Sequence, residues 1–324
     1  MTKVTGCGKL APERNEFDSL PAVGDFRLPP TLDPDALDLG ASVVRQLRKH
    51  GLAIVGFRPG AEQAIIDEAF QATAELFTEH MPTDQAGMRY SAGDNGGYRA
   101  RKVQANEEQQ DLNRTFNIGP AGTFIPHRNE IEGSVVRLER ARNVIVRKLE
   151  QVLYALPLSH RPPLDEGTVL SVNFYDQPGQ WQQGTHCDGV PLTGLVINRL
   201  GLQVRCQDGY RRVAPDTKRL VIMSSGILQG MGEPTVHRVV VENPKDLEGR
   251  ISLVCFGTFP PDHPATALID PALPEAIRDS EEDFALRDPN DPQAPSFYAF
   301  PLESDHWNER DNPKISSDEH AVRI

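Results

Sequence analysis

Two polar residues in the stretch "GTHCDGVPLTG", residues 184–194, could bind a metal ion. His186 and Asp188 lie two positions apart in strand-like sequence, so a regular strand would direct both side chains to one face. Because H-x-D occurs by chance in many proteins, this pair alone does not identify a site. A second histidine, His237, follows 51 residues after His186 in the strand-like segment "VHRVVVE". Two histidines and one carboxylate form the facial triad that holds non-haem Fe(II) and leaves coordination positions open.

An arginine and a serine downstream supply what an anionic co-substrate would need. Arg250 and Ser252 lie two positions apart in "RISLVCF", so both would project into the interior, where an arginine is costly unless it meets an anion. Arg250 would clamp the distal carboxylate of 2-oxoglutarate, with the Ser252 hydroxyl as a second donor. Tyr175, eleven residues before His186, could bring a phenol to the same carboxylate.

The elements that must position these residues change in character along the chain. Helical spacing of apolar residues predicts a helix from Ala41 that ends near Gly51, a second over 61–81 that Pro82 ends, and a third over 132–156. Residues 83–131 are mostly polar and include glycines, so we expect a loop-rich lid over the substrate there. Between Val169 and Phe259, short apolar runs separated by turn signals predict a β-sandwich or barrel. The expected fold class is therefore mixed α/β (α+β).

In combination, these motifs resemble those of the isopenicillin N synthase-like family of 2-oxoglutarate/Fe(II)-dependent oxygenases. The N-terminal half is also similar to that family, with a helix leading to "KHGLAIVGF" and a long helix ending in "ELFTEHM". The resemblance covers roughly residues 25–260, and the tail 261–324 shows no family signature. The ordered residues that carry it are Asn173 and Tyr175, His186 and Asp188, "GLQV" at 201–204, "HRV" at 237–239, and Arg250 with Ser252.

The resemblance implies a double-stranded β-helix, or jelly-roll, core that binds Fe(II), with 2-oxoglutarate and O2 as co-substrates. We expect a single catalytic unit over 1–324: a mostly helical N-terminal region with lid loops at 1–165, the jelly-roll core at 166–260 and a C-terminal extension at 261–324. The expected reaction is oxidation of a C–H bond of a small molecule, as hydroxylation, desaturation, cyclisation or epimerisation. Asp188 disfavours halogenation, because related halogenases lack that carboxylate.

Two alternatives stay open at this point. A 2-oxoglutarate-independent Fe(II) oxidase on the same fold would use Arg250 and Ser252 to hold the carboxylate of its own substrate. A non-catalytic metal-binding jelly-roll protein would have the same ligands. Of these two alternatives, only the 2-oxoglutarate-independent oxidase would oxidise a substrate. An assay for consumption of the co-substrate distinguishes it from a 2-oxoglutarate-dependent oxygenase.

The amino-acid composition and the net charge limit the kinds of partner that the protein could bind. With 34 basic against 46 acidic residues, the net charge of −12 counts against a nucleic-acid partner. The sequence has no run of about 18 apolar residues that would indicate a membrane span, and no apolar signal segment at its N-terminus, so we expect a cytoplasmic location. The four cysteines form no C-x-x-C pair and are expected to be reduced thiols.

The excess of arginine over lysine, with abundant alanine and proline, is typical of high-GC bacteria and favours a role in antibiotic or other secondary-metabolite biosynthesis. The oligomeric state is open, and the tail segment "SFYAFPLESDHW" would either fold over the active-site mouth or pack on a neighbour.

Overall fold

The computed structural model of the protein describes most of the chain between residues 24 and 257 and one strand beyond it. The described residues are 24–81, 96–99, 113–155, 164–176, 181–188, 190–206, 209–224, 235–241, 243–257 and 296–298. Within them, no helix combines the length and the apolar character needed to cross a membrane.

Three α-helices form where the sequence pattern predicts them. The first, α2, spans Leu39–His50 and ends at Gly51, whose φ of +75° is a left-handed conformation suited to glycine. The second, α3 (Ala61–Glu75), continues into a π-helical turn, η2 (Leu76–His80). The long helix α4 spans Glu132–Tyr154. Short 3-10 turns occur at η4 (Arg128–Glu130), η5 (Leu164–Glu166) and η6 (Pro244–Asp246).

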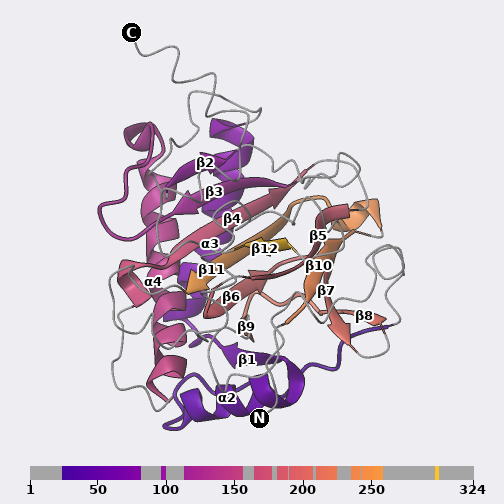
Figure 1. Cartoon of the computed structure of the whole chain (residues 1–324). Coiled ribbons are helices and arrows are strands. Elements are labelled where there is room, and N and C mark those ends of the chain that lie inside the picture. Colours follow the sequence, from indigo (N-terminus) through magenta and orange to yellow (C-terminus); the bar gives the residue numbers. More distant parts are fainter. Residues whose placement is uncertain are drawn as a thin grey trace, which may run out of the picture.

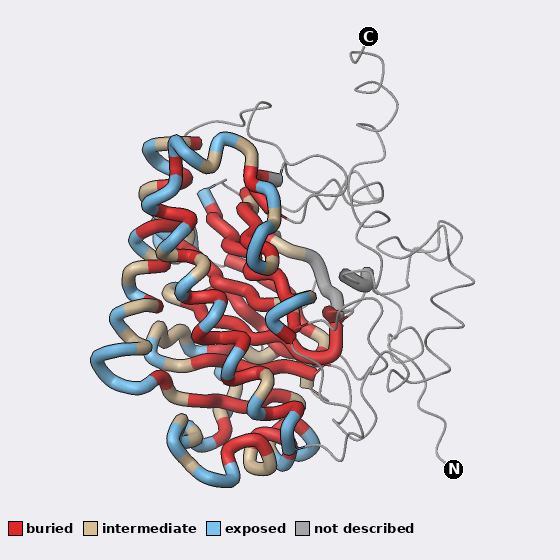
Figure 2. Tube along the Cα trace, turned by 90° about the vertical axis from the view of Figure 1, so that its left-hand side faces the viewer, coloured by how far each residue is buried: buried red, intermediate tan, exposed pale blue. Residues whose placement is uncertain are grey.

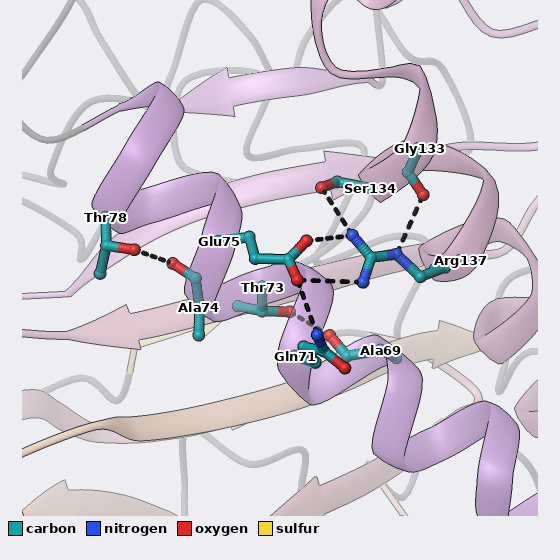
Figure 3. Close-up of polar contacts among 9 residues, drawn as sticks. All are labelled: Ala69, Gln71, Thr73, Ala74, Glu75, Thr78, Gly133, Ser134 and Arg137. Carbon is teal, nitrogen blue, oxygen red and sulfur yellow. Dashed lines mark hydrogen bonds and ion pairs between the residues drawn. The ribbon is translucent and has the colours of Figure 1, made fainter.

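Helices α3 and α4 pack against each other through both apolar and polar contacts. Figure 3 shows Arg137 of α4 reaching the Glu75 carboxylate of α3, with its Nη1 3.3 Å from Glu75 Oε1 and its Nη2 paired with Oε2. Gln71 donates to the same carboxylate at 2.9 Å. The Arg137 guanidinium lowers the pKa of Glu75. This cluster fixes the two helices relative to each other at the surface of the protein.

The larger sheet has seven strands among the described residues, and all of its pairings are antiparallel. Its outer face packs on α3 and α4, and its strands are mostly buried while the helices carry the exposed residues (Figures 1 and 2). Its order is β1 (Leu52–Gly56), β9 (Arg219–Ser224), β6 (Leu192–Ile197), β11 (Arg250–Gly257), β4 (Val169–Tyr175), β3 (Arg114–Ile118) and β2 (Gly97–Arg99).

The second sheet has five strands among the described residues and lies against the inner face of part of the first. Its order is β12 (Ser296–Tyr298), β5 (Trp181–Asp188), β10 (His237–Val240), β7 (Leu202–Cys206) and β8 (Gly209–Arg212). Leu202 and Val204 of β7 pack on Leu195 and Ile197 of β6, so an apolar core separates the two sheets. Two facing, mostly antiparallel sheets with helices outside are the jelly-roll architecture predicted from the sequence (Figure 1).

The sequence Asp208-Gly209 is a signal for a tight hairpin, and the strands on its two sides do pair. Strands β7 and β8 pair antiparallel, with Cys206 opposite Gly209, and Gly209 has a φ of +124°. Within the segment 83–131, where we expect a loop-rich lid, the described residues form β2, β3 and η4, so this part is more regular than expected; residues 82–95 and 100–112 lie outside the described part of the chain. The side chains of β3 alternate between its two faces. Phe116 and Ile118 lie in the helix-side core, whereas Thr115 and Asn117 lie on the other face.

The tail contributes β12 to the second sheet. Ser296–Tyr298 pairs in parallel with β5, with Ser296 opposite His186 and Tyr298 opposite Asp188. The backbone of the tail therefore lies along the strand that carries the predicted metal ligands. The other residues of 258–324 lie outside the described part of the chain.

Candidate active site

Strands β5 and β10 bring Asp188 and His237 together. The Nε2 atom of His237 lies 3.8 Å from Oδ1 of Asp188, and each residue is only 5% exposed. The Nδ1 atom of His237 is 2.9 Å from the carbonyl oxygen of Thr235. Because a carbonyl only accepts hydrogen bonds, this contact places a proton on Nδ1, so that in the neutral imidazole the Nε2 lone pair lies on the side of Asp188. A neutral imidazole nitrogen beside a buried carboxylate is suited to a divalent metal ion.

Thr235 is itself fixed in place. Its backbone N–H donates to the Ser224 carbonyl at 2.8 Å, and its hydroxyl donates to the carbonyl of Gly51, the residue that ends α2. The carbonyl that orients His237 is thus tied to strand β9 and to the N-terminal helical region. Such outer contacts orient a ligating histidine before any metal binds.

The third predicted ligand, His186, is placed by its backbone. It lies opposite His237 in the register of β5 and β10, two residues before Asp188 on the same strand. The side chain of His186 is outside the described part of the structure. Among the side chains that are described, no three His, Cys, Asp or Glu residues gather into a cluster. The complete triad therefore stays a prediction, with two of its members in contact distance.

An irregularity in β5 shapes the site. Between the pairs His237↔His186 and Val239↔Gln183, β5 advances three residues while β10 advances two. This extra residue is a β-bulge, which reverses the alternation of side chains along the strand. As a result Gln183 and Asp188, an odd and an even position, line the same cavity. A regular strand would place them on opposite faces.

Arg250 is wholly buried on β11 and faces this cavity. Its Nε donates to the Leu200 carbonyl at 2.8 Å, and its guanidinium carbon lies 3.9 Å from the centroid of the Tyr175 ring. Both terminal nitrogens, Nη1 and Nη2, are buried without a hydrogen-bond partner among the residues that the structure describes. A buried cation with two unused donors is unfavourable unless it meets an anion, and the parallel Nη donors match a carboxylate.

The close approach of Leu200 to Arg250 depends on Gly201. A Cβ at this position would lie 2.7 Å from Arg250 Nε, and the φ of Gly201 is +136°. Glycine removes both obstacles, since it has no Cβ and adopts positive φ without strain.

Ser252 and Asn173 complete the wall next to Arg250. They are opposite each other in the register of β11 and β4, and both are buried. The hydroxyl of Thr115 on β3 donates to Asn173 Oδ1 at 2.8 Å. Among the described residues, Tyr175, Asp188, His237, Arg250 and Ser252 all line one cavity of about 20 Å³. Five of the six residues predicted from the sequence therefore meet in one place.

Comparisons with known proteins point to the same architecture. No protein-family model matches the chain, and no curated protein sequence does. Among solved structures, JOX2 in complex with 2-oxoglutarate, Fe and JA aligns with a TM-score of 0.59 and 20% identity, over 81% of this chain and 85% of that one. The chain has the fold of the 2-oxoglutarate/Fe(II) oxygenases. A full-length Neurospora crassa protein in complex with alpha-KG gives a TM-score of 0.56 at 16% identity, over 71% of this chain and 85% of that one. The dioxygenase for auxin oxidation 1 from Arabidopsis thaliana, with 2-oxoglutarate, gives 0.54 at 15% identity, over 75% of this chain and 98% of that one.

A larger groove elsewhere on this oxygenase fold has different chemistry. It has a volume of about 680 Å³ and lies between residues 119–125, α4 and η5. Its two arginines are already paired, Arg128 with Glu139 at 2.6 Å and Arg142 with Asp165 at 2.6 Å. With its cations neutralised by neighbouring carboxylates, this groove does not offer Arg250's unused donors.

Several residues of the site have no signal in the sequence. Leu200 acts through its backbone carbonyl, and Gln183 enters the cavity only because of the bulge. Gly201 belongs to the "GLQV" motif used for the resemblance, yet its contact with Arg250 depends on folding that joins residues about 50 positions apart. Arg99 and Arg101 lie in the segment expected to form the lid, where an arginine could reach a substrate anion; Arg99 is on β2, but its side chain and the whole of Arg101 are outside the described part of the structure.

Proposed function

We propose that this protein is an Fe(II)- and 2-oxoglutarate-dependent oxygenase that oxidises a C–H bond of a small molecule. The observation that carries the proposal is Arg250, a fully buried guanidinium with two nitrogens unpaired among the described residues, in the cavity that Asp188 and His237 also line. Anion clamp and metal ligands in one cavity are what a keto acid needs if it is to bind a metal at one end and a cation at the other. The fold shared with JOX2 and the Neurospora crassa protein, whose structures contain 2-oxoglutarate or alpha-KG, supports the same assignment.

The described ligands fit a divalent iron ion. His237 through Nε2, Asp188 through its carboxylate and, as predicted, His186 would hold it, and the single carboxylate would leave one positive charge for an anionic keto acid. When bound, Fe(II) would supply the means to couple O2 and 2-oxoglutarate to substrate oxidation, giving succinate, CO2 and, for a hydroxylation, one oxygen atom in the product.

The chain's own residues would then position the co-substrate. Arg250 would donate to the distal carboxylate through Nη1 and Nη2, because its Nε already donates to the Leu200 carbonyl. Ser252, two residues further along β11 on the same face, would add a hydroxyl donor. The Tyr175 ring would support the guanidinium through a cation–π contact rather than through its phenol.

The apolar part of the wall would exclude water from the reaction. It is formed by Leu195, Ile197, Leu202, Met223, Val239, Val254 and Phe256. The cavity among the described residues is about 20 Å³, and Met223, unbranched and flexible, would adjust its side chain as a keto acid enters.

The finer assignment concerns the substrate. We propose a small molecule in bacterial secondary metabolism, handled in the cytoplasm, where a reducing environment keeps Fe(II) and thiols such as that of Cys255 reduced. The compounds named with the neighbours, JA in the JOX2 complex and auxin in the name of the Arabidopsis dioxygenase, are also small molecules. A kcat/KM far higher for a protein side chain or a common primary metabolite would contradict this substrate class.

The first test is an anaerobic titration of the metal-free protein with Fe(II) and then 2-oxoglutarate. We expect a weak visible charge-transfer band that needs both components, because it arises only when the keto acid chelates iron. His237→Ala and Asp188→Ala should abolish the band, whereas Arg250→Leu should shift its appearance to higher 2-oxoglutarate concentration. If iron binds and no band forms, the 2-oxoglutarate-independent oxidase replaces this proposal.

A further inference from the structure

One buried amide near the active site has no partner among the described residues. Asn117 on β3 is 0% exposed, and neither its Oδ1 nor its Nδ2 makes a hydrogen bond within the part of the chain that the structure describes. A buried carboxamide that makes no hydrogen bond is unfavourable, and buried polar side chains are usually satisfied. Such a group is retained at a cost to stability, which indicates a use in binding.

The register shows which way Asn117 faces. It is two residues after Thr115 on the same strand, so both lie on one face of the sheet. Thr115 donates to Asn173, which lines the cavity with Asp188 and Arg250. Asn117 is therefore on the inner face of the sheet, on the side of the predicted iron site, whereas Phe116 and Ile118 point into the helix-side core.

The immediate strand neighbours of Asn117 have no charge. Across β4 its register partner is Ser171, a buried hydroxyl, and across β2 it is Gly97, which has no side chain to offer. On the far side of Ser171 comes Val254 of β11, which lines the cavity. With strands about 4.8 Å apart, Asn117 lies about 10 Å from that wall, the distance of a substrate's recognition group rather than of its reacting carbon.

We propose that Asn117, with the hydroxyl of Ser171 beside it, is a substrate-recognition subsite for a neutral amide such as a lactam. A carboxamide presents one acceptor and two donors, and an amide edge of the substrate, with one N–H and one C=O, satisfies both kinds of atom at once. The absence of charge on Ser171 and Gly97 favours this neutral group over a carboxylate. The assignment deepens the proposed function and rests on it for the identity of the reaction, though not for the binding of the amide.

The test compares matched probes on the full chain. Saturation-transfer NMR would follow 2-pyrrolidinone, a lactam, beside cyclopentanone and N-methyl-2-pyrrolidinone, which have the same ring size and lack the N–H. Each is measured with metal-free protein and with Zn(II) and 2-oxoglutarate added. We expect the lactam to bind at least about five-fold more strongly than either control, because only it satisfies both atoms of Asn117.

Asn117→Leu supplies the second arm, since leucine has nearly the shape of asparagine. It should abolish the preference for the lactam and, by removing an unsatisfied buried amide, raise the Tm by a few degrees. The matched control is Asn198→Leu, because Asn198 donates to the Gly249 carbonyl at 2.8 Å and accepts from the Ile251 N–H at 2.8 Å. That variant should lower the Tm and keep the lactam preference.

The outcomes separate the two proposals. Equal binding of lactam and ketone to the unaltered protein overturns the subsite, and so does a lactam preference that survives Asn117→Leu. A fall in Tm for Asn117→Leu would mean that the amide is a structural group, which also overturns it. If the lactam binds selectively while no charge-transfer band forms with Fe(II) and 2-oxoglutarate, the subsite stands and the oxygenase proposal fails. The probe comparison needs no variant, so it decides the question even if Asn117→Leu does not fold.

Discussion

Replacing Gly201 with alanine should weaken 2-oxoglutarate binding although no residue that contacts the co-substrate is replaced. The new Cβ would lie 2.7 Å from Arg250 Nε, whereas ordinary contacts begin at 3.4 Å. The guanidinium must therefore retreat by about 0.7 Å, and the 2.8 Å hydrogen bond from Nε to the Leu200 carbonyl cannot keep its geometry. The two Nη donors move with the rest of the planar group.

The expected size follows from the interaction that is disturbed. A hydrogen bond to a charged group contributes about 1.5–3 kcal/mol, and each 1.4 kcal/mol is about tenfold in affinity. If the misplaced guanidinium loses about one such bond to the carboxylate, the Kd for 2-oxoglutarate rises about 10- to 100-fold. Backbone strain at the φ of +136° should in addition lower the stability by about 1–2 kcal/mol.

The assay is the anaerobic charge-transfer titration at saturating Fe(II), with Gly249→Ala as the matched control. Gly249 has a φ of +64°, and a Cβ added there would have no described atom within 4 Å, so the same substitution imposes strain but no clash. We expect both variants to lose stability and only Gly201→Ala to lose affinity. An unchanged Kd in Gly201→Ala, or an equal loss in Gly249→Ala, would refute the steric role assigned to Gly201.

Three further expectations follow from described contacts. Tyr175→Phe should keep the Kd for 2-oxoglutarate within about twofold and Tyr175→Leu should raise it about 3- to 10-fold, because the ring and not the hydroxyl contacts the guanidinium; a large effect of Tyr175→Phe in the titration would show that the phenol binds. Glu75→Gln should lower the Tm at pH 7. Because the folded-state pKa of Glu75 is lowered by Arg137, that stabilisation is present above its ordinary value near 4.5 and is lost as the pH falls through the folded pKa, so melting curves of the two proteins should converge in acid. Burial raises the pKa of the Cys255 thiol to about 12, so iodoacetamide should leave Cys255 unmodified in the native protein at pH 8 and alkylate it in urea, as peptide mass mapping would show.

Much of the fold could be predicted because, in the regular elements, the spacing of apolar residues agrees with the positions of the glycines and prolines that end helices and strands. Helix α2 ends at a glycine with positive φ, as its sequence indicates, and β4 and β11 are mostly apolar segments of strand length. Strand β3 could not be recognised in the same way although "RTFNI" alternates, because one of its faces is polar and it lies in a long polar segment. That polar face contains Thr115 and Asn117. The strand that could not be predicted from the sequence is therefore the one that carries the proposed subsite.

The site could be predicted as a set of residues and not as an arrangement. The i, i+2 spacing of Arg250 and Ser252 identifies one face of a strand correctly. The same rule fails across the bulge in β5, where an extra residue brings Gln183 to the cavity. Nor does sequence spacing reveal that Tyr175 contributes its ring to Arg250, since that contact follows from the pairing of β4 with β11.

Strand β12 covers one side of β5. Without the pairing of Ser296–Tyr298, β5 would be the outermost described strand of its sheet, and its backbone N–H and C=O groups between His186 and Asp188 could pair with another extended peptide. The chain covers this edge with a segment of its own tail. A protein shortened before Ser296 would therefore leave β5, the strand that carries the predicted ligands His186 and Asp188, with unpaired backbone groups. Pairing of this strand with another molecule would then compete with the binding of metal.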